Sequence, residues 1–180
     1  MTPGLIRHKI CPYSPSRPYC PYTFTIASTI KITGPFTGRA ADCEPILRAI
    51  PEWFGIESSI LNYLKRIDVL PTFLALDSEK PIGFLTVERY GVHSAEMLVM
   101  GVYKEYHRQG IGRRLVKTAE EYLLALGVEY IQVKTLSDSH PDLNYTKTRE
   151  FYYALGFRKL EEFPTLWGAA SPCLQLIKKL

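Results

Sequence analysis

Three predicted strands separated by short turns constrain this chain more than any other feature. They are Thr72–Leu76, Ile82–Arg89 and Glu96–Val102. A parallel connection needs a crossover of a dozen or more residues, so strands this close together are expected to pair as antiparallel neighbours. The intervening stretches, Asp77–Pro81 and Tyr90–Ser94, are short enough for hairpins. The middle of the chain therefore predicts an antiparallel sheet and argues against a parallel βαβ nucleotide fold.

Helices and further strands are predicted around this sheet. Thr23–Thr33 is rich in β-branched residues and is predicted as a strand. Apolar residues at three-to-four spacing predict helices at Ala40–Ile50, Ile56–Val69, Gly110–Leu126 and Tyr145–Leu155. In the second of these helices the apolar stripe is Ile56, Ile60, Leu64 and Ile67. The last predicted strands are Val128–Thr135, Phe157–Phe163 and Cys173–Lys178. The pattern predicts one α/β domain over residues 23–180 with a sheet of mixed direction, preceded by a proline-rich arm over residues 1–22.

Composition excludes several classes of protein. With 180 residues of which 46% are apolar, the chain has the length and core of one domain and is not a disordered protein. No stretch approaches the roughly 18 apolar residues that a membrane span needs. The net charge is +4, but residues 1–30 hold three basic residues and no acidic one, which leaves +1 for the rest. A domain so nearly neutral predicts no nucleic-acid partner.

The four cysteines do not form a recognisable site. Cys11, Cys20, Cys43 and Cys173 include no C-x-x-C pair, and none lies near a histidine at zinc-finger spacing, so we expect no metal site. Their spacing also argues against a disulfide framework, and the N-terminus lacks the apolar core of a secretory signal. We therefore predict reduced cysteines and a cytoplasmic location.

The segment Met100–Arg114, MGVYKEYHRQGIGRR, carries the most chemical information. A predicted strand runs into a turn with Gly110 and Gly112, and a helix begins at once. Glycine lets the backbone approach a ligand closely, and the first turn of a helix presents unpaired N–H groups and partial positive charge. Further positive charge comes from Arg108, Arg113 and Arg114. The segment predicts a pyrophosphate site, or else only a tight strand-to-helix turn.

This segment resembles a known motif. The run V-Y-K-E-Y-H-R-Q-G-I-G-R-R-L is similar to the acetyl-CoA-binding motif Gln/Arg-x-x-Gly-x-Gly/Ala of the GNAT superfamily of N-acetyltransferases. The later F-Y-Y-A-L-G-F (Phe151–Phe157) resembles the superfamily's C-terminal helix and following strand. The resemblance covers Lys31 to Leu180 and implies a mixed, mostly antiparallel sheet flanked by helices. Two positions depart from the pattern: His107 stands at the Gln/Arg position, and Tyr145, beside Asn144, stands where many members have asparagine.

The resemblance implies how acetyl-CoA, the co-substrate, would be held. Backbone groups of Met100 and Val102 would pair with the pantetheine arm, and Gly101 would lie at a β-bulge between them. The N–H groups of the loop would hold the pyrophosphate, which assigns cofactor contacts to Arg108, Gln109, Gly110, Ile111, Gly112 and Arg113.

Acetyl transfer to an amine also requires a base and an acid. A lysine-like amine with a pKa of about 10.4 is neutral in only about one molecule in 2,500 at pH 7, so a base must take its proton. Glu96 is the candidate, because strand alternation would place it on one face with Leu98, Met100 and Val102 and because it matches the glutamate base of the histone-acetylating branch. The alternative is a solvent-facing or salt-bridged strand carboxylate.

Tyr152 is the candidate acid for the leaving thiolate, by match to the tyrosine of the family's F-Y motif. A phenol with a pKa of about 10 can protonate a thiolate whose conjugate acid lies near 8.5. The alternative is an aromatic residue packed in the core. Its neighbour Tyr153 is predicted at the surface.

Other residues are weaker candidates. Glu88 and His93 could line the acceptor cleft, Trp53 and Phe54 could form its wall or pack in the core, His140 is predicted in a solvated loop, and Cys173 is predicted as buried core. We predict direct attack by a small-molecule or peptide amine in a ternary complex, with a homodimer possible for this superfamily. Two alternatives remain: a non-catalytic acyl-CoA sensor, and an interaction domain whose proline-rich arm binds a partner.

Overall fold

A computed structural model describes residues 30–180 of the chain. The predicted proline-rich arm and most of the predicted strand Thr23–Thr33 lie outside the described residues. The strands are β1 (Lys31–Phe36), β2 (Thr72–Asp77), β3 (Lys80–Arg89), β4 (Ser94–Val102), β5 (Tyr130–Leu136), β6 (Arg158–Phe163) and β7 (Cys173–Lys179). The helices are α1 (Ala40–Arg48), α2 (Glu57–Ile67), α3 (Ile111–Ala125) and α4 (Leu143–Ala154), with a 3-10 turn at Lys104–Tyr106.

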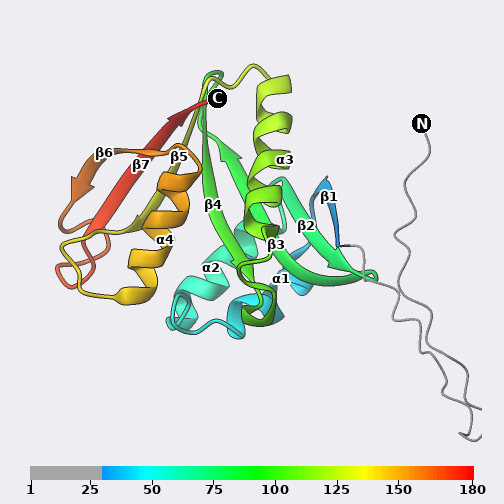
Figure 1. The fold of residues 1–180 in the computed structure, drawn as a ribbon, viewed down its shortest axis with the longest axis horizontal. Coiled ribbons are helices and arrows are strands. Elements are labelled where there is room, and N and C mark those ends of the chain that lie inside the picture. Colours follow the sequence, from blue (N-terminus) through cyan, green and yellow to red (C-terminus); the bar gives the residue numbers. More distant parts are fainter. Residues whose placement is uncertain (1–29) are drawn as a thin grey trace, which may run out of the picture.

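Within this part of the chain the strands form one sheet in the order β1-β2-β3-β4-β5-β7-β6 (Figure 1). The β4–β5 pair is parallel and every other neighbouring pair is antiparallel. The parallel pair is joined through α3, the crossover that a parallel connection requires. The predicted mixed, mostly antiparallel sheet is confirmed.

Element ends differ from the predicted ends by a few residues, for local reasons. Helix α4 begins at Leu143, two residues early, because the Asp142 side chain caps it by accepting hydrogen bonds from the N–H groups of Asn144 and Tyr145. Ile56 was expected on the buried stripe of the second helix. It lies instead at the helix N-cap and is 65% exposed, so this expectation was wrong.

The helices cover both faces of the sheet, with α3 and α4 on one face and α1 and α2 on the other (Figure 1). Leu115, Ala119 and Leu123 of α3 share one apolar core with Tyr152 of α4. Residues of α1 and α2 form a second core against the opposite face, with Cys43, Ile46, Leu47, Ile60 and Ile67 buried. Groups on opposite faces of the sheet can therefore come together only at an opening between strands.

Such an opening lies between β4 and β5. These strands pair only through Ser94–Glu96 of β4 and Tyr130–Gln132 of β5. Beyond Glu96, β4 continues to pair with β3 and β5 continues to pair with β7, while the two central strands have no further partner residues in common. Residues 97–102 of β4 pair with β3 on one side and have no strand partner on the β5 side. They therefore present a free edge in the middle of the sheet.

A β-bulge on β4 corrects two expectations. Val87 lies opposite Met97 and the adjacent Thr86 lies opposite Val99, so Leu98 is the extra residue. Gly101 pairs regularly with Phe84 and is not at the bulge. A Cβ on Gly101 would lie 3.1 Å from Ile46 and Phe84 side-chain atoms, so close packing against α1 explains the glycine.

The same bulge reverses the alternation along β4. Met97 packs in the core beneath α3, whereas Val99 packs in the core beneath α1 and α2. Glu96 therefore shares a face with Val99, and the prediction that it shares one with Met100 and Val102 was wrong. An inserted residue moves every later side chain to the other face, because the strand period is two.

Candidate functional site

The open edge of β4 presents backbone hydrogen-bonding groups. The Tyr103 N–H donates to the Ile82 carbonyl at 3.0 Å, which makes these two residues a hydrogen-bonded antiparallel pair. Because such pairs alternate with non-hydrogen-bonded pairs, Val102 and Met100 direct their N–H and C=O groups away from β3, into the opening. The Val102 carbonyl is engaged there by His107 Nε2 at 2.8 Å. This edge can receive an extended, amide-bearing ligand as a further strand.

A loop with unpaired N–H groups follows this edge. Gly110 is the N-cap of α3 with φ of 78°, and Arg108 has φ of 63°. No side chain caps the helix, and its first backbone hydrogen bond runs from the Arg114 N–H to the Gly110 carbonyl at 3.0 Å. The N–H groups of residues 111–113 are therefore available, together with the positive end of the helix dipole. The predicted loop has the geometry of an anion site.

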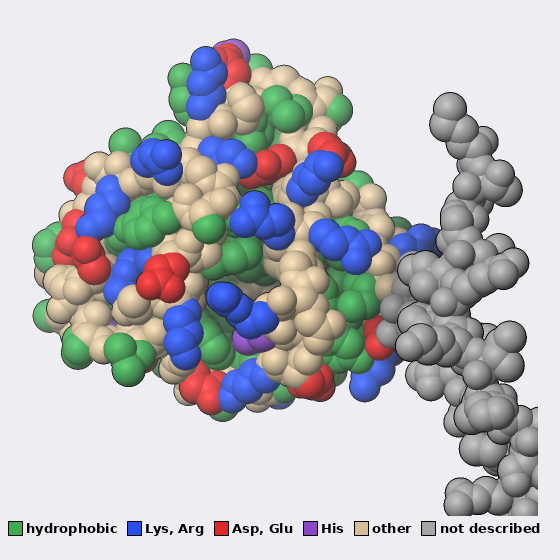
Figure 2. All heavy atoms as spheres, viewed as in Figure 1, with side chains coloured by type: hydrophobic (Ala, Val, Ile, Leu, Met, Phe, Trp, Pro, Cys, Tyr) green, Lys and Arg blue, Asp and Glu red, His purple; other side chains and the backbone are tan. Residues whose placement is uncertain are grey.

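The three arginines of this segment do not all face the loop. Arg113 reaches toward α4, with Nη2 3.5 Å from the Ala154 carbonyl. Arg114 donates to the Ile30 carbonyl at 2.8 Å, on the β1 side of α3, and so points away from the opening. Lys and Arg side chains nevertheless surround a hollow between α3 and α4 (Figure 2). Helix α3 starts tightly against α4, since a Cβ on Gly112 would lie 3.2 Å from the Phe151 ring.

Trp53 links the two faces of the sheet. It lies in the α1–α2 connection, and its Nε1–H donates to Thr148 Oγ1 of α4 at 3.0 Å. The Tyr145 hydroxyl donates to the Trp53 carbonyl at 3.2 Å, and the Trp53 ring contacts the His107 ring edge-on with centroids 6.1 Å apart. Trp53 therefore forms a wall of the opening, whereas Phe54 packs against Tyr63 of α2.

Glu96 lies in a polar cluster on the α1–α2 face. It is 5% exposed, and its Oε2 accepts hydrogen bonds from Lys134 Nζ at 2.7 Å and from Gln132 Nε2 at 3.0 Å. Glu88 lies directly across from Glu96 on β3 and forms an ion pair with Arg66 of α2. Glu96 is thus a buried, salt-bridged carboxylate, in a cluster that also includes the candidate Glu88.

Tyr152 lies on the opposite face, 7% exposed, with its ring between those of Phe151 and Phe157. Burial raises its pKa well above 10, and neighbouring Tyr145 and Tyr63 add to the rise. The phenol therefore stays protonated across the physiological range, and the raised pKa makes it a weaker acid than a free phenol.

Tyr63 of α2 lies near both Glu96 and the tyrosines of α4. Burial, then Tyr63 and Asp142, raise the pKa of Tyr145 to about 12. Burial and then Glu96 raise the pKa of Tyr63. Tyr63 packs in the core on the α1–α2 face and adds to the raised pKa values of Tyr145 and Tyr152. The Glu96 carboxylate and the Tyr152 phenol lie on opposite faces of the sheet.

Two of the remaining candidates, His93 and His140, lie outside this site. His93 pairs with Glu129 at 2.8 Å at the exposed β3–β4 turn. His140 Nδ1 accepts from the Asp142 N–H at 3.3 Å within its loop. Cys173 is fully buried, as predicted, and burial raises the pKa of its thiol to about 11, so it is no nucleophile. Tyr153 was expected at the surface, but its hydroxyl is buried and has no partner among the described residues.

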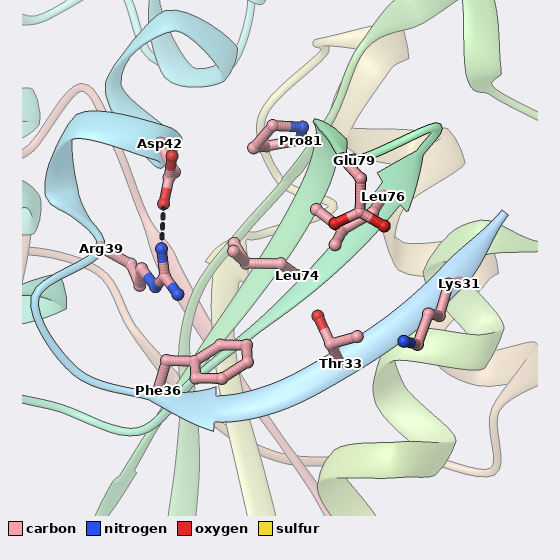
Figure 3. Close-up of a pocket in the computed structure, with 9 residues that line it drawn as sticks. All are labelled: Lys31, Thr33, Phe36, Arg39, Asp42, Leu74, Leu76, Glu79 and Pro81. Atoms are coloured by element: carbon pink, nitrogen blue, oxygen red, sulfur yellow. Dashed lines mark hydrogen bonds and ion pairs between the residues drawn. The ribbon is translucent and has the colours of Figure 1, made fainter.

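A pocket among the described residues lies away from this site. Its volume is about 290 Å³, and it lies between β1, β2 and the start of α1 (Figure 3). Arg39 there forms an ion pair with Asp42 at 3.0 Å and lies over the Phe36 ring. None of the predicted catalytic or cofactor residues lines it. In residues 30–180 we find no acidic, histidine and cysteine cluster suited to a metal ion, and no helix with the length and apolarity to cross a bilayer.

Sequence reasoning missed several members of the site. Gln132 and Lys134 contact Glu96, and their alternation with Ile131 and Val133 in the predicted strand was a usable signal of a polar face. Tyr63 lay inside a predicted helix without any mark of function. Its role emerges only from the packing of α2 against the sheet.

Comparisons with known proteins agree with this arrangement. The model of the acetyltransferase (GNAT) family matches residues 42–157. A GNAT-family acetyltransferase structure from Desulfovibrio desulfuricans has a TM-score of 0.72 at 12% identity, covering 84% of this chain and 99% of its own. An aminoglycoside 6'-N-acetyltransferase from Enterococcus faecium has a TM-score of 0.64 at 21% identity, with coverage of 83% and 96%.

A third similar structure is the ribosomal-protein-S18-alanine N-acetyltransferase from Escherichia coli, with a TM-score of 0.66 at 17% identity and coverage of 84% and 94%. No curated protein matches the chain by sequence. At these identities the structures show a common fold and leave the substrate open. The family model covers well over half of the chain, at the strands, loop and helices that form the opening, and the chain therefore belongs to the GNAT family of acetyltransferases.

Proposed function

We propose that this protein is an N-acetyltransferase that moves the acetyl group of acetyl-CoA directly to an amine in a ternary complex. The observation that carries the proposal is the free edge of β4, which leads into the uncapped start of α3. Met100 and Val102 would bind the pantetheine amides, and Arg108 through Arg113 would bind the pyrophosphate. The His107 ring must leave the Val102 carbonyl if pantetheine is to use that acceptor.

The reaction needs two proton transfers, and the site offers a group for each. The neutral amine attacks the thioester carbon, a C–N bond forms, and the C–S bond breaks. Glu96 would accept the amine proton, directly or through water, from the α1–α2 face. Tyr152, kept protonated by burial, would donate to the departing thiolate from the α4 face. The acceptor is proposed as a small-molecule or peptide amine, and the homodimer and cytoplasmic location stay predictions.

One observation favours the alternative of a non-catalytic acyl-CoA-binding module. Glu96 already holds an ion pair with Lys134, as a purely structural strand carboxylate would. Such a module needs the β4 edge and the α3 loop but neither proton-transfer group. Binding alone therefore does not distinguish the two functions, whereas turnover does.

Calorimetric titration with acetyl-CoA, with ATP and NADH as controls, tests the binding half of the proposal. We expect binding of acetyl-CoA only. A thiol-release assay with an aminoglycoside, a peptide with a free N-terminal alanine and a peptide with a free lysine then tests transfer. No binding at millimolar acetyl-CoA would refute both functions. Binding without thiol release from any amine would favour the acyl-CoA-binding module.

A further inference from the structure

A charged pair lies at the start of the β4–β5 opening. The Lys134 ammonium of β5 is 2.7 Å from Oε2 of Glu96 on β4. The Glu96 side chain is 7% exposed and the Lys134 side chain 25% exposed, so water screens this pair far less than a surface ion pair. Gln132, the register partner of Glu96, donates to the same carboxylate oxygen at 3.0 Å. The second oxygen, Oε1, receives neither of these two contacts.

Two opposing effects act on the Glu96 carboxylate. Burial disfavours the charged form, because a carboxylate loses its hydration in the protein interior. An ammonium within about 4–6 Å favours the charged form by Coulomb attraction. At Glu96 both conditions are present. Without Lys134, only the hydrogen bonds that Glu96 accepts would oppose burial and the like charge of Glu88.

Within residues 30–180, Lys134 is the cation that pairs with Glu96. Arg66 of α2 is committed to Glu88, which faces Glu96 from β3 as a like charge. Glu88 itself would therefore make Glu96 easier to protonate if Lys134 were neutral.

The other groups facing Glu96 are neutral hydrogen-bonding groups. Tyr90, after β3, lies under Lys134, whose Nζ is 5.9 Å from the ring centroid. Burial and hydrogen bonds to Glu96 and Glu88 raise the pKa of Tyr90. Tyr63 of α2 and Cys173 of β7 also feel the Glu96 charge, and the pKa of each is raised, chiefly by burial. These groups keep their protons at neutral pH, so Lys134 alone supplies a compensating charge.

We propose that Lys134 is a positioning residue that stabilises the ionised form of Glu96, which is the form able to accept the proton of the attacking amine. The inference rests on the proposed function only for what Glu96 does. The effect of Lys134 on Glu96 itself is a property of the folded protein without substrate. A purely structural role for this ion pair would be to stabilise the pairing of β4 with β5. On this proposal, the ion pair also sets the pH range in which Glu96 can act as a base.

The direct test is a carbon-detected NMR titration of the Glu96 carboxyl group in protein labelled at glutamate side chains. The Glu96→Gln variant assigns the resonance. We expect the Glu96 midpoint to rise by about one to three pH units in Lys134→Met, and to stay near its original value in Lys134→Arg. Thermal unfolding identifies folded variants. Lys134→Gln serves as the neutral variant if Lys134→Met does not fold.

The matched control is Lys159→Met. Lys159 also pairs with a carboxylate, Asp138 at 2.6 Å, but this pair is exposed and away from β4. Its removal should leave the Glu96 midpoint unchanged. Thiol release is then measured against pH with the amine that gives the fastest turnover among the three acceptors. The acid limb of the kcat/KM profile should move to higher pH in Lys134→Met and stay in place in Lys159→Met. An unmoved Glu96 midpoint in folded Lys134→Met, or an equal shift in Lys159→Met, overturns the proposal.

Different outcomes refute the proposed mechanism and the inference about Lys134. If Glu96→Gln keeps full activity, Glu96 is not the base, and the proposed mechanism fails while the NMR titration still decides whether Lys134 controls Glu96. If Glu96→Gln loses activity but Lys134→Met leaves both midpoint and acid limb in place, the mechanism stands and the inference about Lys134 is refuted.

Discussion

Replacing Gly110 by alanine tests whether the loop conformation matters for acetyl-CoA. Gly110 has φ of 78°, and a Cβ built on it meets no atom within 4 Å, so the only cost of alanine is conformational. That cost is about 1–2 kcal/mol for an L-residue in the left-handed region. In one case the loop of the variant keeps the strained conformation with and without ligand, and the cost appears as a loss of stability. In the other case the free loop relaxes, and the cost appears only when acetyl-CoA binds. The losses of stability and of binding free energy should therefore sum to about 1–2 kcal/mol.

The two limits give measurable numbers. If the free loop relaxes fully, the acetyl-CoA Kd rises about 5-fold to 30-fold, since 1.4 kcal/mol is a factor of ten. If it does not relax, the melting temperature falls by about 2–8 °C with no change in Kd. Calorimetric titration and thermal unfolding of the same sample measure both quantities.

Gly127 provides a matched control at the other end of α3. Its φ is 79°, a Cβ there also meets nothing within 4 Å, and it lies beyond the helix C-terminus. Gly127→Ala should lose stability by the same mechanism and keep its affinity for acetyl-CoA. The reasoning is refuted if Gly110→Ala matches wild type in both quantities, or if Gly127→Ala loses as much affinity as Gly110→Ala.

Three further predictions concern the proton-transfer groups and the arm. Glu96→Gln should lower kcat by about 10²–10⁴-fold, most at low pH, with the acetyl-CoA Kd unchanged in calorimetry; an unaltered pH–rate profile would remove Glu96 from the mechanism. Tyr152→Phe should slow thiol release with binding intact. Folding raises the pKa of Tyr152 above its unfolded value, so the contribution of this phenol to stability is complete below pH 10 and declines above it. The melting temperature of Tyr152→Phe should therefore fall less between pH 10 and 12 than that of wild type. Deletion of residues 1–22 should leave the acetyl-CoA Kd unchanged, since every proposed site residue lies between Trp53 and Tyr152; loss of binding would assign the arm a part in the site.

Local pattern was enough for most of the fold. The short turns between the three central strands required antiparallel pairing, and the glycines before α3 and after it marked both helix ends. These features depend on neighbouring residues only. The sequence pattern failed to predict the β-bulge at Leu98, which shifts the alternation of the later residues of β4. This bulge arises from the pairing of β3 with β4, and no glycine or proline at Leu98 indicates it in the sequence.

The candidate site shows the same division between local and non-local information. The loop around Gly110 is local in sequence, and its geometry is the one expected from Met100–Arg114. The environment of Glu96 is not local, because Lys134 lies 38 residues away and reaches it only through the β4–β5 pairing. A motif can therefore nominate the carboxylate, but it cannot show that an ammonium faces it. On the proposal made for Lys134, the chemistry of the site depends on the register of two strands as much as on the residues of the motif.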